Sequence, residues 1–231
     1  MQFPQHIGII PDGNRTRAKD RGLSALDGHS AGQKNSIELL KFLVTTPVCV
    51  ATFWGLSTEN LRERSSLECA GLFALFDHAL SWLDVLFATE KIAFRRVGSP
   101  VWIPDKTLKS FLAFQEKHTY SDAKLTAVFA INYGGRDEIL RGVERRQEAW
   151  SPKLDESTFG QYLDFGDLPV IDLVIRTKAE EAQRVSGFMS RWIGYAELYF
   201  SQLKFPDFSP TELQKALERR SDRADKRNFG K

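Results

Sequence analysis

The chain has few of the features that mark several large classes of protein. Its 231 residues include only two cysteines, Cys49 and Cys69, which stand in apolar stretches without the spacing of metal ligands. This setting favours buried free thiols in a reducing compartment. No apolar run approaches the about 20 residues that span a bilayer, and the N-terminus lacks a basic-then-apolar signal pattern. We therefore expect a soluble, cytoplasmic protein.

An excess of charge of one sign is also missing. The formal net charge is +2 with 27% charged residues, which is too balanced for a general nucleic-acid binder. Hydrophobic residues make up 42% of the chain, which excludes a disordered or low-complexity protein. The length suits a substantial core, and no linker or internal repeat is evident. We expect one domain over residues 1–231.

Continuous apolar runs alternate with helical patterns along the chain. Because the runs do not alternate between apolar and polar residues, they are typical of parallel strands covered on both faces. The predicted strands are 5–10, 48–54, 92–97, 124–131 and 170–175. The predicted helices are about 29–45, 67–90, 105–118, 135–149, 155–163 and 209–225. The fold class is α/β, a mostly parallel central sheet flanked by helices.

The first predicted strand ends in Asp12-Gly13-Asn14, and Gly28-His29 follows one loop later. Ligands of open α/β folds collect at the carboxyl ends of strands. The aspartate can hold magnesium through oxygen, and the glycine lets backbone N–H groups approach a phosphate. A tight turn that needs these residues for its backbone angles explains the motif about as well.

Two further polar stretches follow predicted strands. After the second strand, Ser65 and Glu68 fit a helix capping box, but this does not explain the polar stretch from Ser57 to Asn60. After the 170–175 strand, Arg176, Arg184 and Ser186 make a plausible diphosphate clamp, because guanidinium groups bind phosphate oxygens in pairs. A solvated charged loop is the simpler reading of that composition.

Two apolar segments carry unusual residues. The 67–90 helix has an apolar stripe wider than one core face usually needs, which indicates either a well-buried helix or the lining of an apolar tunnel for a hydrocarbon ligand. The strand-like run Tyr195 to Phe200 contains the lone acid Glu197. Such an acid is costly without a partner, and a metal ion is one such partner.

The order of these pieces identifies a family resemblance. The blocks that carry it are His6 with Pro11-Asp12-Gly13-Asn14, Gly28-His29-Ser30-Ala31-Gly32, Ser57-Thr58-Glu59-Asn60 with Arg64 and Glu68, Ile131-Asn132-Tyr133-Gly134-Gly135-Arg136, Asp172 to Thr177 with Arg184-Val185-Ser186, Tyr195 to Phe200 with Phe205-Pro206-Asp207-Phe208, and Arg227-Asn228-Phe229-Gly230. In this order and spacing they resemble the cis-prenyltransferase (Z-isoprenyl diphosphate synthase, undecaprenyl-diphosphate-synthase-like) family over nearly the full length.

The resemblance implies a magnesium-dependent homodimeric transferase that condenses isoprenoid diphosphates: an allylic diphosphate with isopentenyl diphosphate. It implies no nucleic-acid partner, and a peripheral membrane association only if the product is long. The residues that it marks as catalytic are Asp12, Asn14, Ser57 and Asn60. Those that it marks as substrate-binding are Gly13, Arg15, Arg17, His29, Arg64, Glu68, Arg176, Arg184 and Ser186. The metal ligands would be Asp12 and Glu197.

The chain also departs from the family pattern. Thr16 and Ala25 stand where the family usually has arginine, so two phosphate-binding cations are missing, and Arg15 and Arg17 are the candidates to replace them. The loop after Arg176 is two residues longer, with Lys178 in place of a small residue.

These departures favour a short or irregular, head-to-middle (lavandulyl-type) product. The bulky Phe73 and Phe76 on the 67–90 helix agree with a short tunnel. Ordinary long-chain, undecaprenyl-type elongation is the first alternative. A non-catalytic accessory subunit of a prenyltransferase is the second, and the retained Asp12 speaks against it.

Overall fold

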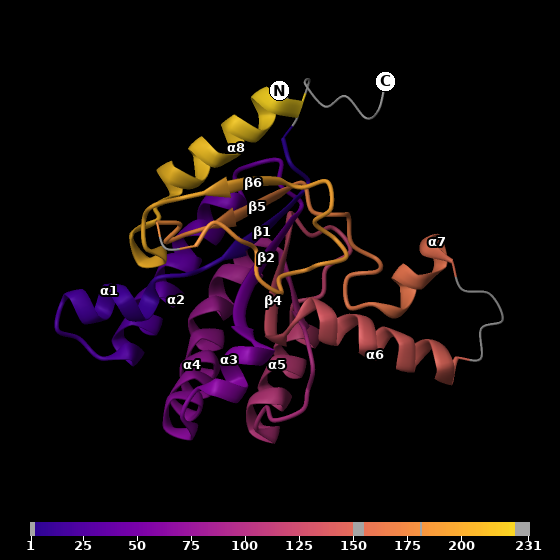
Figure 1. The fold of residues 1–231 in the computed structure, drawn as a ribbon, viewed down its shortest axis with the longest axis horizontal. Coiled ribbons are helices and arrows are strands. Elements are labelled where there is room, and N and C mark those ends of the chain that lie inside the picture. The colour runs from indigo at the N-terminus through magenta and orange to yellow at the C-terminus, as the bar shows by residue number, and fades with distance from the viewer. Residues whose placement is uncertain (1–2, 150–154, 181, 225–231) are drawn as a thin grey trace.

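The computed structural model describes residues 3–149, 155–180 and 182–224, with one six-stranded sheet at the centre (Figure 1). The strands are β1 (His6–Ile10), β2 (Val50–Ser57), β3 (Ile92–Val97), β4 (Leu125–Tyr133), β5 (Leu173–Arg176) and β6 (Glu197–Phe200). Their spatial order is β3-β4-β2-β1-β5-β6, and every neighbouring pair is parallel. The expected mostly parallel sheet is thus confirmed, with all of its described strands parallel.

Helices cover the sheet. They are α1 (Asn14–Asp20), α2 (Ala25–Leu43), α3 (Thr58–Glu63), α4 (Ser66–Glu90), α5 (Asp105–Lys117), α6 (Gly135–Glu148), α7 (Glu156–Phe159) and α8 (Pro210–Ala224), with short 3-10 helices η1 (Gly160–Tyr162) and η2 (Phe205–Asp207). The α/β class and the main helices agree with the sequence prediction. The short helices α1 and α3 were not predicted, because seven and six residues are too few to display an apolar period.

The core has two parts, one on each face of the sheet. The larger part joins β-strand side chains to α2, α4, α5 and α8, and includes the fully buried Leu40 and Phe87. The smaller part lies on the opposite face, where Phe165, Phe188 and Met189 pack against Val128. Burial on both faces explains why the strand sequences are continuous apolar runs.

Helix α4 is apolar over most of its length. Ser65 caps it by accepting the backbone N–H of Glu68 at 3.2 Å, as the sequence suggested. Contrary to the sequence expectation, α4 is long and apolar enough to cross a membrane by length and composition. The core helix of a soluble protein passes the same test, and α4 packs against α2, α5 and β3.

The two cysteines differ from the expectation in one respect. Both are free thiols, and Cys69 is buried on α4 as predicted. Cys49 is exposed, because it precedes β2 in the connection after Pro47 instead of lying inside the strand. The prediction that both thiols are buried is therefore wrong for Cys49.

The topology brings three chain segments together at one edge of the sheet. Strand β1 lies between β2 and β5, and the chain leaves it on one side for β2 and returns later on the other side as β5. Side chains that follow the carboxyl ends of these neighbouring parallel strands therefore meet. Asp12 follows β1, Ser57 ends β2, and Arg176 ends β5. Ligands of open α/β sheets bind at such a reversal of strand order.

Candidate active site

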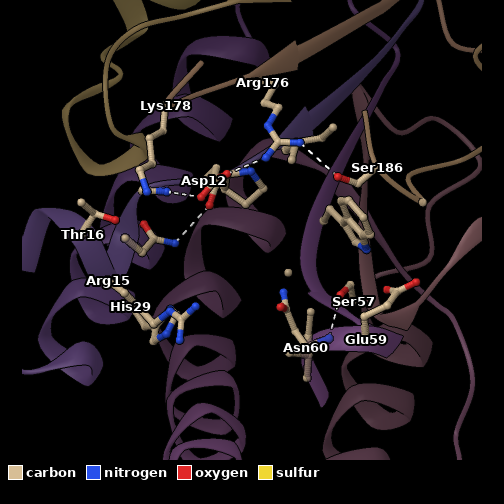
Figure 2. Close-up of a pocket in the computed structure, with 18 of the residues that line it drawn as sticks. Asp12, Arg15, Thr16, His29, Ser57, Glu59, Asn60, Arg176, Lys178 and Ser186 are labelled. Carbon is tan, nitrogen blue, oxygen red and sulfur yellow. Dashed lines mark hydrogen bonds and ion pairs between the residues drawn. The ribbon is translucent and has the colours of Figure 1, made fainter. Parts of the chain in front are cut away.

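A pocket of about 520 Å³ opens at the carboxyl edge of β1, β2 and β5 (Figure 2). Most of the side chains that the sequence singled out line it. They are Asp12, Gly13, Asn14, Arg15, His29, Ser57, Asn60, Arg64, Arg176, Arg184 and Ser186. Residues from five separate stretches of sequence thus share one cavity.

The Asp12-Gly13-Asn14 turn begins the pocket wall. Gly13 has a φ of 102° and donates its N–H to Asp12 Oδ1 at 2.8 Å. A side chain at Gly13 would also lie 2.9 Å from Cβ of Lys204, so this position requires glycine. Thr177 Oγ1 donates to the Asp12 carbonyl at 2.7 Å, which ties the turn to β5. The backbone requirement of a tight turn is therefore met, and the same turn presents Asp12 to the pocket.

One group of side chains lines the pocket at the ends of β1 and β5, and we call it the strand-edge group. Its members are Asp12, Arg176, Lys178, Arg184 and Ser186. The buried Arg176 donates from Nη2 to Asp12 Oδ2 at 2.7 Å and from Nη1 to the Arg184 carbonyl at 2.6 Å. Its Nη1 also lies 3.2 Å from Ser186 Oγ. Three cationic side chains accompany one carboxylate here, so this wall attracts anions.

A second cluster, which we call the helix group, has four members. They are Arg15 from α1, His29 from α2, Arg64 from the α3–α4 connection and Glu68 from α4. Glu68 Oε1 lies 3.5 Å from both Arg64 Nε and His29 Nε2, and 3.8 Å from Arg15 Nη1. These nitrogen–oxygen distances are typical of ion pairs and are longer than those of good hydrogen bonds. Within the described chain, these atoms of Glu68, Arg64 and His29 are buried without a hydrogen-bond partner. Such buried, unsatisfied groups indicate a ligand site.

The imidazole of His29 is neutral near pH 7. Burial, together with the positive charge of Arg64, lowers the pKa of His29 from 6.5 to about 4, against the opposing effect of Glu68. Burial also lowers the pKa of Arg64. An anion bound between these residues would relieve both effects, because it favours their charged forms.

Two glycines of α2 seat the turn against this helix. A Cβ on Gly28 would lie 2.3 Å from the Asn14 carbonyl oxygen, and one on Gly32 would lie 2.4 Å from Asn14 Oδ1. Four positions apart, both glycines share one face of the helix. His29 is adjacent to this close contact, which explains how the Gly28-to-Gly32 block brings its ring to the pocket.

An apolar cavity of about 80 Å³ adjoins the charged pocket. The two share Pro11, Asn14, His29 and Gly55 in their walls. The apolar part of the lining comes from α2, α4, β2, β4 and η2, namely Ile37, Phe53, Leu72, Phe76, Ala79, Leu83, Phe129 and Phe205. An amphipathic ligand would thus find charge at one end and hydrocarbon at the other. This is the place where the sequence suggested a tunnel.

Ser57 and Asn60 lie on another wall, with Glu59 beside them (Figure 2). Ser57 Oγ accepts the Asn60 N–H at 3.0 Å and thereby caps α3. The hydroxyl therefore has a structural bond in addition to its exposure to the pocket.

Three predicted site residues, Arg17, Glu68 and Glu197, do not line the pocket, although Glu68 contacts Arg64 and His29, which do. Arg17 turns away and donates from Nε to Asp207 at 2.7 Å. Glu197 begins β6 in register with Leu173, which is itself paired with Ile7. This register places Glu197 level with Ile7, whereas Asp12 follows the other end of β1. A metal-ligand role for Glu197 stays a prediction.

Other differences concern residues that sequence reasoning left out. Glu63 and Lys178 line the pocket, although the sequence gave Lys178 only as a departure from a pattern. Phe76 lines the apolar cavity, whereas Phe73 is buried in the core beside it, with ring centroids 6.4 Å apart. The closing block Arg227-Asn228-Phe229-Gly230 lies outside the described residues.

Comparisons with known proteins cover the whole chain. Residues 10–230 match the family model described as "Putative undecaprenyl diphosphate synthase". An isoprenyl transferase of Aquifex aeolicus is 35% identical over 100% of this chain and 97% of that protein. A tritrans,polycis-undecaprenyl-diphosphate synthase (geranylgeranyl-diphosphate specific) of Thermoplasma acidophilum is 36% identical over 93% of this chain and 84% of that protein.

A solved structure is similar in fold. The crystal structure of lavandulyl diphosphate synthase from Lavandula x intermedia, in complex with dimethylallyl diphosphate, superimposes with a TM-score of 0.91. It is 28% identical in sequence, and the match covers 99% of both chains. The similarity therefore extends over the sheet, the helices and the pocket-bearing loops together.

Proposed function

The chain belongs to the undecaprenyl diphosphate synthase family of prenyltransferases, and from this premise we propose that it joins an allylic five-carbon diphosphate to a second five-carbon unit. The observation that carries the proposal is the small apolar cavity, about 80 Å³, attached to the charged pocket of about 520 Å³. A dry cavity of roughly 150 Å³ holds one benzene. At about half that volume, this cavity holds no more than one isoprene unit, which favours a short product.

The pocket chemistry suits departure of diphosphate. The C–O bond at C1 of the allylic substrate breaks, the electron pair leaves with diphosphate, and an alkene carbon of the second substrate bonds to C1. A proton then leaves the new cation for a phosphate oxygen. Arg176 and Arg184 oppose the charge that grows on the departing oxygens, and such fixed charges are among the largest contributions to catalysis. Phe76 and its apolar neighbours keep water from the allylic cation.

Magnesium fits the strand-edge group. The Asp12 carboxylate is partly exposed to the pocket, and magnesium is commonly held by one or two carboxylates together with substrate phosphates. The described residues contain no cluster of three or more His, Cys, Asp or Glu that would hold a metal without substrate. Asp12 would hold the ion, and bound magnesium would neutralise charge on the leaving diphosphate.

We propose that the coupling is head-to-middle. In that reaction C1 of one dimethylallyl unit bonds to C2 of another, so two allylic diphosphates suffice. The cavity limits the hydrocarbon to a short chain, and the lavandulyl diphosphate synthase shares the fold over nearly its whole length. A linear cis product from isopentenyl diphosphate is the alternative, favoured by the undecaprenyl-diphosphate synthase among the relatives.

A product assay tests the proposal. Purified protein with magnesium receives dimethylallyl, geranyl or farnesyl diphosphate, each with and without isopentenyl diphosphate, and the dephosphorylated products are identified by mass spectrometry and NMR. We expect a branched ten-carbon product from dimethylallyl diphosphate alone. A linear cis product that requires isopentenyl diphosphate would replace head-to-middle coupling with elongation. Absence of turnover would favour the accessory-subunit alternative.

Phe76→Ala tests the role of the cavity in product length. Removing the ring opens the floor of the cavity, so we expect a product longer by at least one isoprene unit when isopentenyl diphosphate is supplied. Phe73→Ala is the matched control on the same helix, since Phe73 is buried in the core and does not line the cavity. It should lower the melting temperature without lengthening the product. Equal product lengths in both variants and wild type would remove Phe76 as the limit.

We also propose a homodimer, as the family resemblance implies, and a cytoplasmic location, in keeping with the two free thiols. Strand β6 is an edge strand. Its Leu198 is 43% exposed, and Tyr195, which precedes the strand, is 80% exposed. Apolar residues on an open sheet edge suit a partner surface. Leu198→Lys should shift the protein toward monomer in sedimentation experiments, while the exposed Leu112→Lys on α5 should not. A monomeric wild type would refute the dimer.

A further inference from the structure

Lys178 has a backbone conformation that lysine adopts only at a cost. It is the second residue after β5, and its φ is 56°, in the left-handed region that favours glycine. The backbone is fixed on this side of the sheet, because the Lys178 N–H donates to the Leu203 carbonyl at 2.7 Å and the Ala179 N–H to the Ser201 carbonyl at 2.9 Å. A strained residue that its surroundings hold in place is a reason to look for a function.

The Lys178 side chain is directed into the charged pocket. It lines the cavity, and Figure 2 shows it pointing toward Asp12 from a different side than Arg176. Asp12 already accepts from Arg176 at 2.7 Å and from the Gly13 N–H at 2.8 Å. The carboxylate therefore keeps two donors when Lys178 turns toward an added anion.

The neighbouring helix α1 brings one of its two arginines, Arg15, to the pocket, on the side of the helix group. Arg15 faces Glu68 at 3.8 Å, and Arg17 donates to Asp207 at 2.7 Å. Thr16 lines the same pocket and is uncharged. Lys178 adds a further cation to the pocket, from the loop after β5.

We propose that Lys178 is a diphosphate-binding residue of this chain. Its ammonium group contacts terminal phosphate oxygens of the diphosphate held next to Asp12, on the side opposite to Arg176. An ammonium on a flexible four-carbon stem can turn from the carboxylate to the phosphate without moving the backbone. This inference rests on the proposed prenyl transfer and adds to it a diphosphate-binding cation from the loop after β5.

Lys178→Gly and Lys178→Met separate binding from backbone strain. Binding of inorganic pyrophosphate, with magnesium chloride present, is measured by calorimetry alongside the melting temperature. We expect both variants to bind pyrophosphate about tenfold or more weakly, because a charge-assisted contact is lost. Lys178→Gly should also melt at a higher temperature than wild type, since glycine relieves the left-handed strain, whereas Lys178→Met should not.

Lys91 supplies a matched control. It is also a lysine with positive φ, 53°, but it ends α4 and pairs with Asp122 at the surface, away from the pocket. Lys91→Gly should raise the melting temperature and leave pyrophosphate binding unchanged. A further variant, Lys178→Gly with Thr16→Arg, should recover part of the affinity because position 16 lines the same pocket.

The outcomes distinguish this inference from the proposed function. If Lys178→Gly and Lys178→Met bind pyrophosphate as wild type does, Lys178 is not a phosphate ligand, whatever the product assay shows. If wild type binds pyrophosphate through Lys178 but forms no prenyl product, the proposed function fails and the binding site stands. A wild-type chain that does not bind pyrophosphate overturns the inference as well.

Discussion

On the strand side of the pocket, Arg176 donates to Asp12 at 2.7 Å, whereas on the helix side Arg64 and His29 lie 3.5 Å from Glu68. The strand-edge group is fixed by short hydrogen bonds and by backbone atoms of adjacent strands. The helix group holds charges of both signs close together, but leaves several of their polar atoms without hydrogen bonds. Both groups carry cations, but in the described chain the strand-edge group has one buried polar atom without a partner, Arg176 Nε, whereas the helix group has four.

This difference indicates two ways of using charge in one site. Groups that are already oriented stabilise developing charge without having to reorganise, which is what departure of diphosphate requires. Groups that are buried and unsatisfied gain most from a ligand, because the ligand supplies the missing hydrogen bonds. We therefore expect substitutions in the strand-edge group to act mainly on turnover, and those in the helix group on binding and stability.

Asp12→Asn should give the largest effect. It keeps the shape of the side chain but removes the charge that pairs with Arg176 and would hold magnesium. We expect kcat to fall on the order of 10²- to 10³-fold, with the circular dichroism spectrum unchanged. Asp122→Asn, which breaks only a surface pair with Lys91, is the control and should keep wild-type kcat. A value of kcat within a few-fold of wild type in Asp12→Asn would remove Asp12 from the mechanism.

His29 should make the folded state sensitive to acid. Its pKa is lowered from 6.5 to about 4, so as the pH falls through this range the unfolded chain takes up the proton first. The free energy of unfolding should fall by about 3 kcal/mol for such a group. The pKa of His6 is also lowered to about 4, chiefly by burial, so the wild-type slope has two sources.

Urea unfolding at pH 7, 6 and 5 measures this slope. His29→Asn should remove about half of it, leaving the part due to His6, and saturating pyrophosphate should reduce the slope in wild type by favouring protonated His29. The same slope in His29→Asn and wild type would mean that His29 does not titrate in this way.

Glu68→Gln should have the smallest effect and the opposite sign. Glu68 competes with a bound anion for Arg15 and Arg64. The ion pair of Glu68 with the half-exposed Arg15 contributes about 0.2–1 kcal/mol, so removing the carboxylate charge should tighten pyrophosphate binding by up to about 5-fold. Calorimetry measures the change, with Glu38→Gln on the outer side of α2 as a control. Weaker binding would instead show that Glu68 positions Arg64 for the ligand.

Local sequence was sufficient for the elements and for much of the site. The strand Ile92–Val97 was predicted at its observed bounds, and α4 was placed within one residue, because apolar runs and capping residues act over short distances. The strand-end position of Asp12 followed from one apolar run and one turn. The family resemblance was confirmed over residues 10–230.

Only the tertiary structure decided which side chains face the pocket. Arg15 and Arg17 stand two positions apart on α1, about 200° around the helix, so when one faces the pocket the other cannot. Phe73 and Phe76 share a helix, but packing against the sheet determines that Phe76 reaches the cavity. Glu197 has a suitable residue type for a metal ligand, but only the strand register shows that it is level with Ile7 and outside the pocket lining.

Lys178 is the clearest example of the difference between what the sequence predicts and what the tertiary structure decides. The sequence identified a lysine in an unusual place, but its direction depends on a left-handed backbone that hydrogen bonds to residues 201 and 203 hold in position. Sequence by itself determined the elements and the chemical types available at their ends, because these follow from local patterns. Which charged side chains point into the pocket depends on contacts between segments distant in sequence, and only the folded chain brings these segments together.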